Sequence, residues 1–169
     1  MSATIRPALP ADVRGINRLV EPMTHTGILL GKDLVSYYEA VQEFLVAVDA
    51  DGEVVGCGAL HVMWEDLAEV RTLAVHDDHR GTGLGHQLLD ALLERAVQLG
   101  LERVFCLTFE VEFFTRHGFE VMSEEVDPDV YVQLLRSPDE GIAEFLDLAR
   151  VKPNTLGNTR MIKALPTQS

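Results

Sequence analysis

The chain has 169 residues, 47% of them hydrophobic, and its 27 acidic and 14 basic residues give a formal net charge of −13. This length suits a single core, so we expect residues 1–169 to form one domain. So negative a chain repels nucleic acid and anionic lipid unless basic residues gather on one face, and none gather here. No apolar run approaches the ~20 residues that cross a bilayer. The first residues lack the charged start and apolar core of a secretory signal, and they are not arginine-rich like a transit peptide. We therefore expect a cytoplasmic protein.

The first half of the chain predicts two helices followed by an antiparallel meander. A short strand near the N-terminus precedes apolar residues at helical spacing over 13–20. Asp33 can cap a second helix over 34–41. Residues 44–79 contain three β-rich runs separated by turn signals, of which "DADGE" is a strong hairpin signal.

The second half begins with the most regular pattern of the chain. A leucine stripe over 83–99 predicts a long amphipathic helix that ends at Gly100. The apolar run "RVFCLTF" predicts a buried strand, and a short helix and another strand follow it. Helical patterns over 128–148 and a last strand near 160–165 complete the chain. We therefore expect an α/β fold with a mixed, mostly antiparallel sheet flanked by helices.

The segment "HRGTGLG", residues 79–85, lies between a predicted strand over 70–75 and the long helix. Its order places the first backbone N–H groups of the helix beside the end of that strand, where glycines let an anion approach the backbone. The plainer alternative is a helix start that needs tight turns. A dinucleotide fingerprint would require glycine or alanine in place of His86, and a P-loop would require lysine followed by serine or threonine.

The glycine segment has the form Arg/Gln-x-x-Gly-x-Gly/Ala, and through it the chain resembles the GNAT superfamily of acetyl-CoA-dependent N-acyltransferases. The resemblance continues in "LAEVRTLAV" before the loop, in "RVFCLTF", and in "FFTRHGF" at the family's Tyr-x-x-x-Gly-Phe. It implies the GNAT fold and acetyl-CoA as the acetyl donor, without a metal. It also implies that backbone of Leu73, Ala74 and Val75 pairs with pantetheine, and that Arg80, Gly81, Thr82, Gly83, Leu84, Gly85 and His86 hold the pyrophosphate.

The same resemblance implies a catalytic base at Glu69, where many members carry a carboxylate. An amine must lose a proton before it attacks a carbonyl, so a base within reach is chemically sensible. The alternative is that Glu69 is a solvated strand residue. Phe114 stands where many members have a tyrosine that protonates the leaving thiolate, and the nearby hydroxyl or imidazole candidates are Thr108, Thr115 and His117.

Four longer stretches resemble the short, stand-alone N-acetylglutamate synthases of bacterial arginine biosynthesis. They are "LVSYYEAVQEFLVA", "VVGCGALHVMWEDLAEVRTLAV", "RVFCLTFEVEFFTRHGF" and "GIAEFLDLARVKPNTLGNTRM". The implied reaction is acetyl transfer to the α-amine of L-glutamate, with L-glutamine as a second acceptor to be tested. A dicarboxylate substrate needs dedicated cations in so acidic a protein, so the predicted substrate-binding residues are Lys32, Arg71 and Arg160, with Asn158 near Arg160. For each cation the alternative is an ordinary surface salt bridge.

Several alternatives remain open in the sequence. His76 and His79 could suggest a metal site, but a third ligand is missing nearby and the chemistry needs no metal. We expect Cys57 and Cys106 to be reduced residues of the core. The acceptor could instead be a protein N-terminus, a polyamine or an aminoglycoside, which the acidic surface would attract. A non-catalytic acyl-CoA sensor is a further alternative, and the resembled family often forms homodimers.

Overall fold

The computed structural model describes residues 2–29, 31–123, 126–139, 142 and 158–166. Its strands are β1 (Thr4–Pro7), β2 (Phe44–Val48), β3 (Val54–Trp64), β4 (Leu67–Val75), β5 (Arg103–Thr108), β6 (Glu120–Val121) and β7 (Thr159–Ala164). Its helices are α1 (Val13–His25), α2 (Leu34–Glu39), α3 (Leu84–Gln98), α4 (Val111–Thr115) and α5 (Pro128–Leu134).

One mixed sheet runs through the molecule in the order β1-β2-β3-β4-β5-β7-β6. The strands β1 to β4 form the antiparallel meander that the turn signals predict, and β4 pairs with β5 in parallel. The last strand, β7, lies between β5 and β6 and is antiparallel to both. The predicted mixed, mostly antiparallel sheet is thus confirmed.

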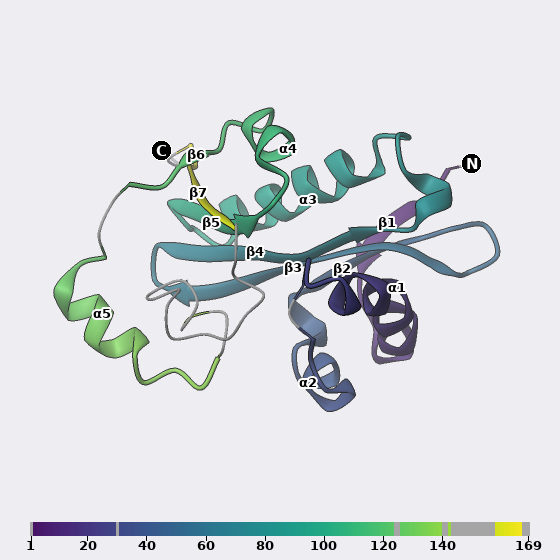
Figure 1. Ribbon diagram of the computed structural model, residues 1–169, viewed down its shortest axis with the longest axis horizontal. Helices are drawn as coiled ribbons and strands as arrows, with labels where there is room; N and C mark the ends of the chain where they lie inside the picture. The colour runs from purple at the N-terminus through teal and green to yellow at the C-terminus, as the bar shows by residue number, and fades with distance from the viewer. Residues whose placement is uncertain (1, 30, 124–125, 140–141, 143–157, 167–169) are drawn as a thin grey trace.

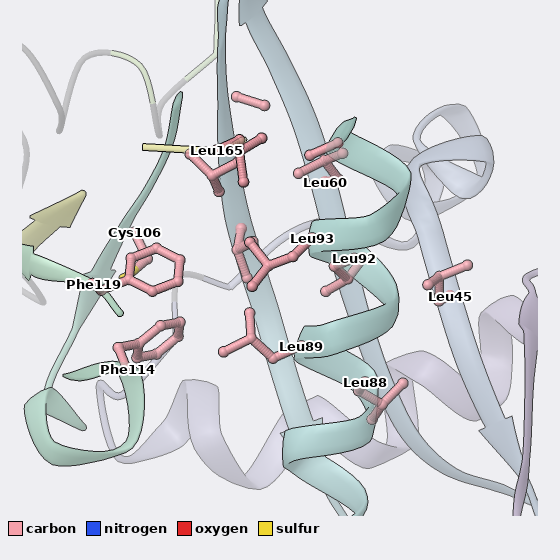
Figure 2. Close-up of a cluster of buried hydrophobic side chains, with 14 of the residues drawn as sticks. Leu45, Leu60, Leu88, Leu89, Leu92, Leu93, Cys106, Phe114, Phe119 and Leu165 are labelled. Carbon is pink, nitrogen blue, oxygen red and sulfur yellow. The ribbon is translucent and has the colours of Figure 1, made fainter. Parts of the chain in front are cut away.

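Helices cover both faces of the sheet (Figure 1). α1 and α2 lie on one face, and α3 and α4 lie on the other. The leucine stripe of α3 forms the core on its face, where Leu88, Leu89 and Leu92 are each 0% exposed. Figure 2 shows these side chains directed from α3 toward the strands. Burying such a side chain contributes roughly 1.5–3 kcal/mol, so this face anchors the long helix and the loop that precedes it.

β4 contains a β-bulge in its pairing with β3. Thr72 has a φ of 55°, an uncommon conformation for a residue other than glycine. The β3–β4 register shifts at the same place, between the pairs that Cys57 and Ala59 make. The parallel ladder between β4 and β5 extends only to the pair Glu69 and Phe105. Beyond that pair β4 and β5 are no longer bonded to each other, which creates the opening for the site.

One predicted helix differs from the structure. The helix expected over 34–41 ends at Glu39, and a 3₁₀ turn over Val41–Glu43 follows it directly before β2. Of the helical patterns predicted over 128–148, the first forms α5, which ends before Pro138, and residues 140–141 and 143–148 lie outside the described part of the chain. Among the described helices, none is long and apolar enough to cross a membrane.

Candidate active site

A cavity of about 880 Å³ lies where β4 and β5 separate. Its walls come from the segments around α2, from the middle of β3 and β4, from Leu107 on β5, and from residues 137–139. Glu69, Arg71 and Lys32 all line it, and Asn158 contributes from the segment that leads into β7. The structure therefore brings the predicted base and three of the four predicted substrate-binding residues to one cavity.

The fourth predicted residue, Arg160, does not line this cavity. It lies on β7 directly opposite Leu107 of β5. Cross-strand partners share one face of a sheet, so Arg160 projects from the same face as a residue of the cavity wall. Its role as a substrate contact stays a prediction.

Arg71 is the centre of a buried ion-pair network. Its side chain is 10% exposed, and Nε and Nη2 donate to Oε2 of Glu69 at 3.2 and 2.6 Å. Nη1 and Nη2 also donate to the two carboxylate oxygens of Asp139 at 2.9 and 3.0 Å. Burial alone would raise the pKa of Asp139, but the bonds and charge of Arg71 outweigh it and hold this pKa at about 2. Arg71 thus pairs with two protein carboxylates before any substrate enters.

Lys32 lies in a different environment within the same cavity. Burial lowers the pKa of its ammonium group, and the nearby positive charge of Arg71 lowers it further. The carboxylates of Asp139, Glu43 and Glu69 act in the opposite direction. Lys32 lines the cavity, so its ammonium group is a candidate partner for a substrate carboxylate.

The glycine loop has the geometry of a backbone anion cradle. Gly81 and Gly83 have φ values of 74° and 85°, and a Cβ added at either would meet no other atom within 4 Å. The first intrahelical bond of α3 runs from Gln87 N–H to the carbonyl of Gly83 at 3.0 Å. The N–H groups of Leu84 and Gly85 therefore have no acceptor within the helix. This arrangement fits a pyrophosphate at the positive end of the helix dipole.

The side chains of the loop secure its shape. The hydroxyl of Thr82 donates to the carbonyl of His79 at 2.6 Å, and Nε of Arg80 lies 3.0 Å from Oδ1 of Asp77. A Cβ on Gly85 would lie 3.7 Å from Cγ2 of Val75, so the loop rests against the end of β4. Backbone N–H groups, rather than charged side chains, therefore form this candidate anion site.

The predicted pantetheine segment lies along the open side of β4. On one side this strand pairs with β3, where Ala74 opposes Cys57 and Val75 opposes Gly56. On the other side its ladder with β5 has already ended at Glu69. An extended ligand can therefore pair with the backbone of Leu73 to Val75 as an added strand would. The coenzyme contacts of these residues stay predictions.

Phe114 belongs to the core rather than to the cavity. It is 6% exposed and packs edge to face on Phe113 and Phe119, with ring centroids 5.2 Å apart in both pairs. Figure 2 shows the rings of Phe114 and Phe119 near Cys106, to the left of α3. Of the other candidate acids, Thr115 donates to the carbonyl of Val111 at 2.7 Å, and Thr108 accepts from the N–H of Glu110 at 2.8 Å.

The last candidate acid, His117, takes part in a cluster that the sequence analysis missed. Its Nε2 lies 2.7 Å from Nδ1 of His86, and its Nδ1 lies 3.0 Å from Oδ1 of Asp90. His86 also stacks on Phe113 at 4.6 Å between ring centroids. His86 and Asp90 are four residues apart on α3, a spacing that puts them on one helix face. The spacing gives no indication of His117, which reaches them from the turn after α4.

Asp139, His61 and Glu43 are the cavity residues that sequence reasoning missed. They reach the cavity from three separate segments. His61 could have been found from the predicted meander, because antiparallel pairing of its second and third strands places His61 opposite Glu69. Asp139 and Glu43 carry no local pattern that distinguishes them from ordinary surface carboxylates.

Both cysteines are expected to be unreactive in the folded protein. Cys57 and Cys106 are 0% and 1% exposed, and burial raises the pKa of Cys57 to about 12 and that of Cys106 further still. Since the thiolate is the reactive form, iodoacetamide should modify neither thiol at pH 8 until the protein is unfolded. Mass spectrometry measures this, and Cys106→Ala should retain acetyltransferase activity. Rapid labelling with loss of activity would contradict the expectation.

The His76 and His79 pair shows no metal geometry. Nδ1 of His76 accepts from the N–H of Asp78 at 3.2 Å, whereas His79 is buried. Among the residues that the structure describes, no group of three histidine, cysteine or acidic side chains could hold a metal ion.

A bulged β4, an open β4–β5 edge and a glycine cradle at a helix start together define a coenzyme A-dependent acyltransferase. The model of the acetyltransferase (GNAT) family matches residues 20–119. An amino-acid acetyltransferase of Mycobacterium tuberculosis is 54% identical over 165 residues, which are 95% of this chain and 94% of that protein. The chain belongs to the GNAT acetyltransferase family, and it is an enzyme that uses acetyl-CoA.

Solved structures agree with this assignment. Rv2747 from Mycobacterium tuberculosis, in complex with CoA and NLQ, has a TM-score of 0.91 and 52% identity, and the match covers 96% of this chain and 99% of that chain. N-acetylglutamate synthase of Neisseria gonorrhoeae with CoA and N-acetyl-glutamate shares the fold, with a TM-score of 0.78, 24% identity and coverage of 98% and 36%. The amino-acid acetyltransferase of Pasteurella multocida is 33% identical over 130 residues. The match covers 76% of this chain but only 29% of that longer protein.

Proposed function

We propose that this enzyme transfers acetyl from acetyl-CoA to the α-amine of L-glutamate or L-glutamine, the first step of arginine biosynthesis. The observation that carries the proposal is that Lys32, Asn158 and Glu69 meet at one cavity where β4 leaves β5. The amino-acid acetyltransferase at 54% identity over almost the whole chain supports it.

In this proposal Glu69 receives the proton of the substrate ammonium group, directly or through water. Its side chain is 6% exposed, and Arg71 binds only its Oε2. The other oxygen, Oε1, can accept a proton from a group in the cavity. When bound, acetyl-CoA supplies the acetyl thioester at the gap between β4 and β5. A thiol with a pKa near ~8.5 leaves with modest help, so the replacement of tyrosine by Phe114 does not prevent turnover.

Lys32 is the cation best placed to bind the substrate carboxylate. Arg71 is already paired with Glu69 and Asp139, so its donors are engaged and it shapes the cavity wall. An ammonium group on a flexible stem can follow a carboxylate of variable position. The amide of Asn158 is a further candidate contact in the same cavity.

The charges around the cavity favour an acceptor with a neutral side chain. Among the described lining residues, the carboxylates are Asp33, Glu39, Glu43, Glu69 and Asp139, whereas the permanent cations are Lys32 and Arg71. A second substrate carboxylate would need its own cation in the cavity, because burying an unpaired charge costs free energy. This balance supports L-glutamine, and L-glutamate would require Arg160 or another cation to turn toward the cavity.

An acetyl-CoA consumption assay across the twenty amino acids tests the proposal. L-glutamine or L-glutamate should give the highest kcat/KM, and Lys32→Met should raise the KM of that amino acid about tenfold or more, because a charged hydrogen bond contributes about 1.5–3 kcal/mol. Arg18→Met is the control, since Arg18 lies at the surface. Faster acetylation of polyamines or peptide N-termini would replace the proposed acceptor, and CoA binding without any turnover would indicate a sensor.

The predicted homodimer and cytoplasmic location belong to the same proposal. Light scattering of the purified enzyme measures its mass directly, and a mass near 18.7 kDa, that of one chain, would contradict the dimer. Fractionation of the producing cells tests the location.

A further inference from the structure

His61 is a cavity residue to which the reaction described above gives no role. It lies on β3, lines the cavity, and stands directly opposite Glu69 in the β3–β4 ladder. Residues directly opposite in an antiparallel pair have Cβ atoms roughly 4.5–5.5 Å apart on the same face. The imidazole is therefore beside the predicted base and on the side of the sheet that the substrate must occupy.

The neighbours of His61 determine which ring nitrogen faces the reaction. Nδ1 of His61 contacts Oε1 of Glu43, which the 3₁₀ turn after α2 brings to this point. When the ring is neutral, a hydrogen bond to this carboxylate places the hydrogen on Nδ1 and leaves the lone pair on Nε2. Nε2 lies 3.9 Å from Oδ2 of Asp139, too far for a hydrogen bond. A carboxylate that fixes the ring in this tautomer is typical of a histidine that acts as a base.

Arg71 restrains the other two carboxylates on this wall, Asp139 at both oxygens and Glu69 at one. Arg71 binds both oxygens of Asp139 and keeps its pKa at about 2, so Asp139 is a poor base. Arg71 also binds Oε2 of Glu69, and Glu69 is only 4% exposed. A buried carboxylate that takes up a proton in each turnover must pass it on. The side chains of His61 and Glu43 are 22% and 28% exposed, so they connect Glu69 to solvent.

We propose that His61, oriented by Glu43, is the proton acceptor that completes acetyl transfer, either from Glu69 or from a water beside it. This inference rests on the proposed function. The substrate ammonium group loses one N–H proton, and the Nε2–H bond of His61 forms with it. The amine nitrogen then forms the C–N bond as the thioester C–S bond breaks, and its second proton passes through solvent to the thiolate of coenzyme A. The imidazolium then returns its proton to solvent past Glu43.

The charges around the ring favour this role. The groups that face His61 are Glu43 from the 3₁₀ turn, Glu69 and Arg71 from β4, Asp139 from the segment after α5, and Lys32 from the segment before α2. Arg71 offsets Glu69 and Asp139 only in part, and Glu43 is in direct contact with the ring. An imidazolium formed at this point has Glu43 in contact with Nδ1 and Asp139 at 3.9 Å from Nε2, and both negative charges favour it.

The test compares His61→Gln and Glu43→Gln with the wild-type enzyme over pH 5.5–9, at saturating acetyl-CoA. His61→Gln should lower kcat about 100-fold, the effect typical of losing a general base, with little change in the KM of the acceptor. Glu43 is a positioning residue, so Glu43→Gln should lower kcat less and move the acid limb of the kcat profile. His25→Gln is the matched control, because His25 is exposed and also lies near a glutamate, Glu21, at 3.8 Å.

A second measurement separates a catalytic role from a structural one. Added imidazole should restore part of the kcat of His61→Ala and should not affect Glu43→Gln or His25→Ala. If His61→Gln does not fold, Glu43→Gln and the rescue experiment carry the test. An unchanged kcat and pH profile in both cavity variants, or no rescue of a folded His61→Ala, would overturn the inference. The acceptor used is whichever amine the wild type acetylates fastest, so a wrong substrate assignment is detected separately.

Discussion

Gly83→Val is expected to weaken the binding of coenzyme A about 100-fold or more. Gly83 stands at the start of α3 with a φ of 85°, and nothing in the folded protein lies within 4 Å of the position of its missing Cβ. The added side chain would therefore fill space that a ligand must enter to reach the N–H groups of Leu84 and Gly85. Hydrogen bonds to a charged group contribute about 1.5–3 kcal/mol each, so losing two of them accounts for this change.

Gly52→Val is the matched control for this variant. Gly52 also has a φ of 85° and open space around its Cβ position, but it lies in the turn between β2 and β3. Both variants should lose about 1–3 kcal/mol of stability from the strained backbone. Only Gly83→Val should lose affinity when calorimetry measures CoA binding. Wild-type affinity in folded Gly83→Val would place the pyrophosphate elsewhere.

Arg71→Ala is expected to lower the free energy of unfolding at pH 7 by about 3 kcal/mol or more. The substitution leaves Glu69 and Asp139 as unpaired carboxylates, and breaking a buried pair by removing one partner is strongly destabilising. Urea denaturation followed by circular dichroism measures the change. The triple variant Arg71→Ala, Glu69→Gln, Asp139→Asn is the control, because it removes the uncompensated charges and should recover part of the loss.

The same variant should change the response of the protein to acid. In the wild type the pKa of Asp139 is depressed from 3.8 to about 2, so its stabilising contribution is present above pH 4 and is lost as the pH falls toward 2. Without Arg71 this loss should disappear, and the stability difference between the two proteins should narrow on acidification. A difference that stays constant from pH 7 to pH 3 would show that Arg71 does not stabilise these carboxylates.

The predictions that succeeded depend on residues close together in the sequence. The leucine stripe over 83–99 determines α3, since side chains three and four apart share one helix face. The glycines before it determine a positive-φ loop at the helix start. The predicted helix beyond residue 34 was too long. Local periodicity contains no information that the chain must leave the helix in time to begin β2 at Phe44.

The acceptor side of the site was only partly predictable. Lys32, Glu69 and Arg71 were singled out, but the sequence did not indicate that Arg71 is paired with Asp139, 68 residues later in the chain. Nor did it indicate that Glu43 contacts His61. A single carboxylate belongs to no repeating sequence pattern that would indicate its partner. The packing of distant segments alone decides which side chain it contacts.

The sequence by itself determined the long helix α3, the meander, the family and the glycine loop of this protein, because each depends on spacing within one segment. Only the tertiary structure decided that β7 enters between β5 and β6, that β4 separates from β5 after Glu69, and that Arg71 is already paired. These features arise where segments far apart in the chain pack together, and their free energy depends on distances that no single segment specifies.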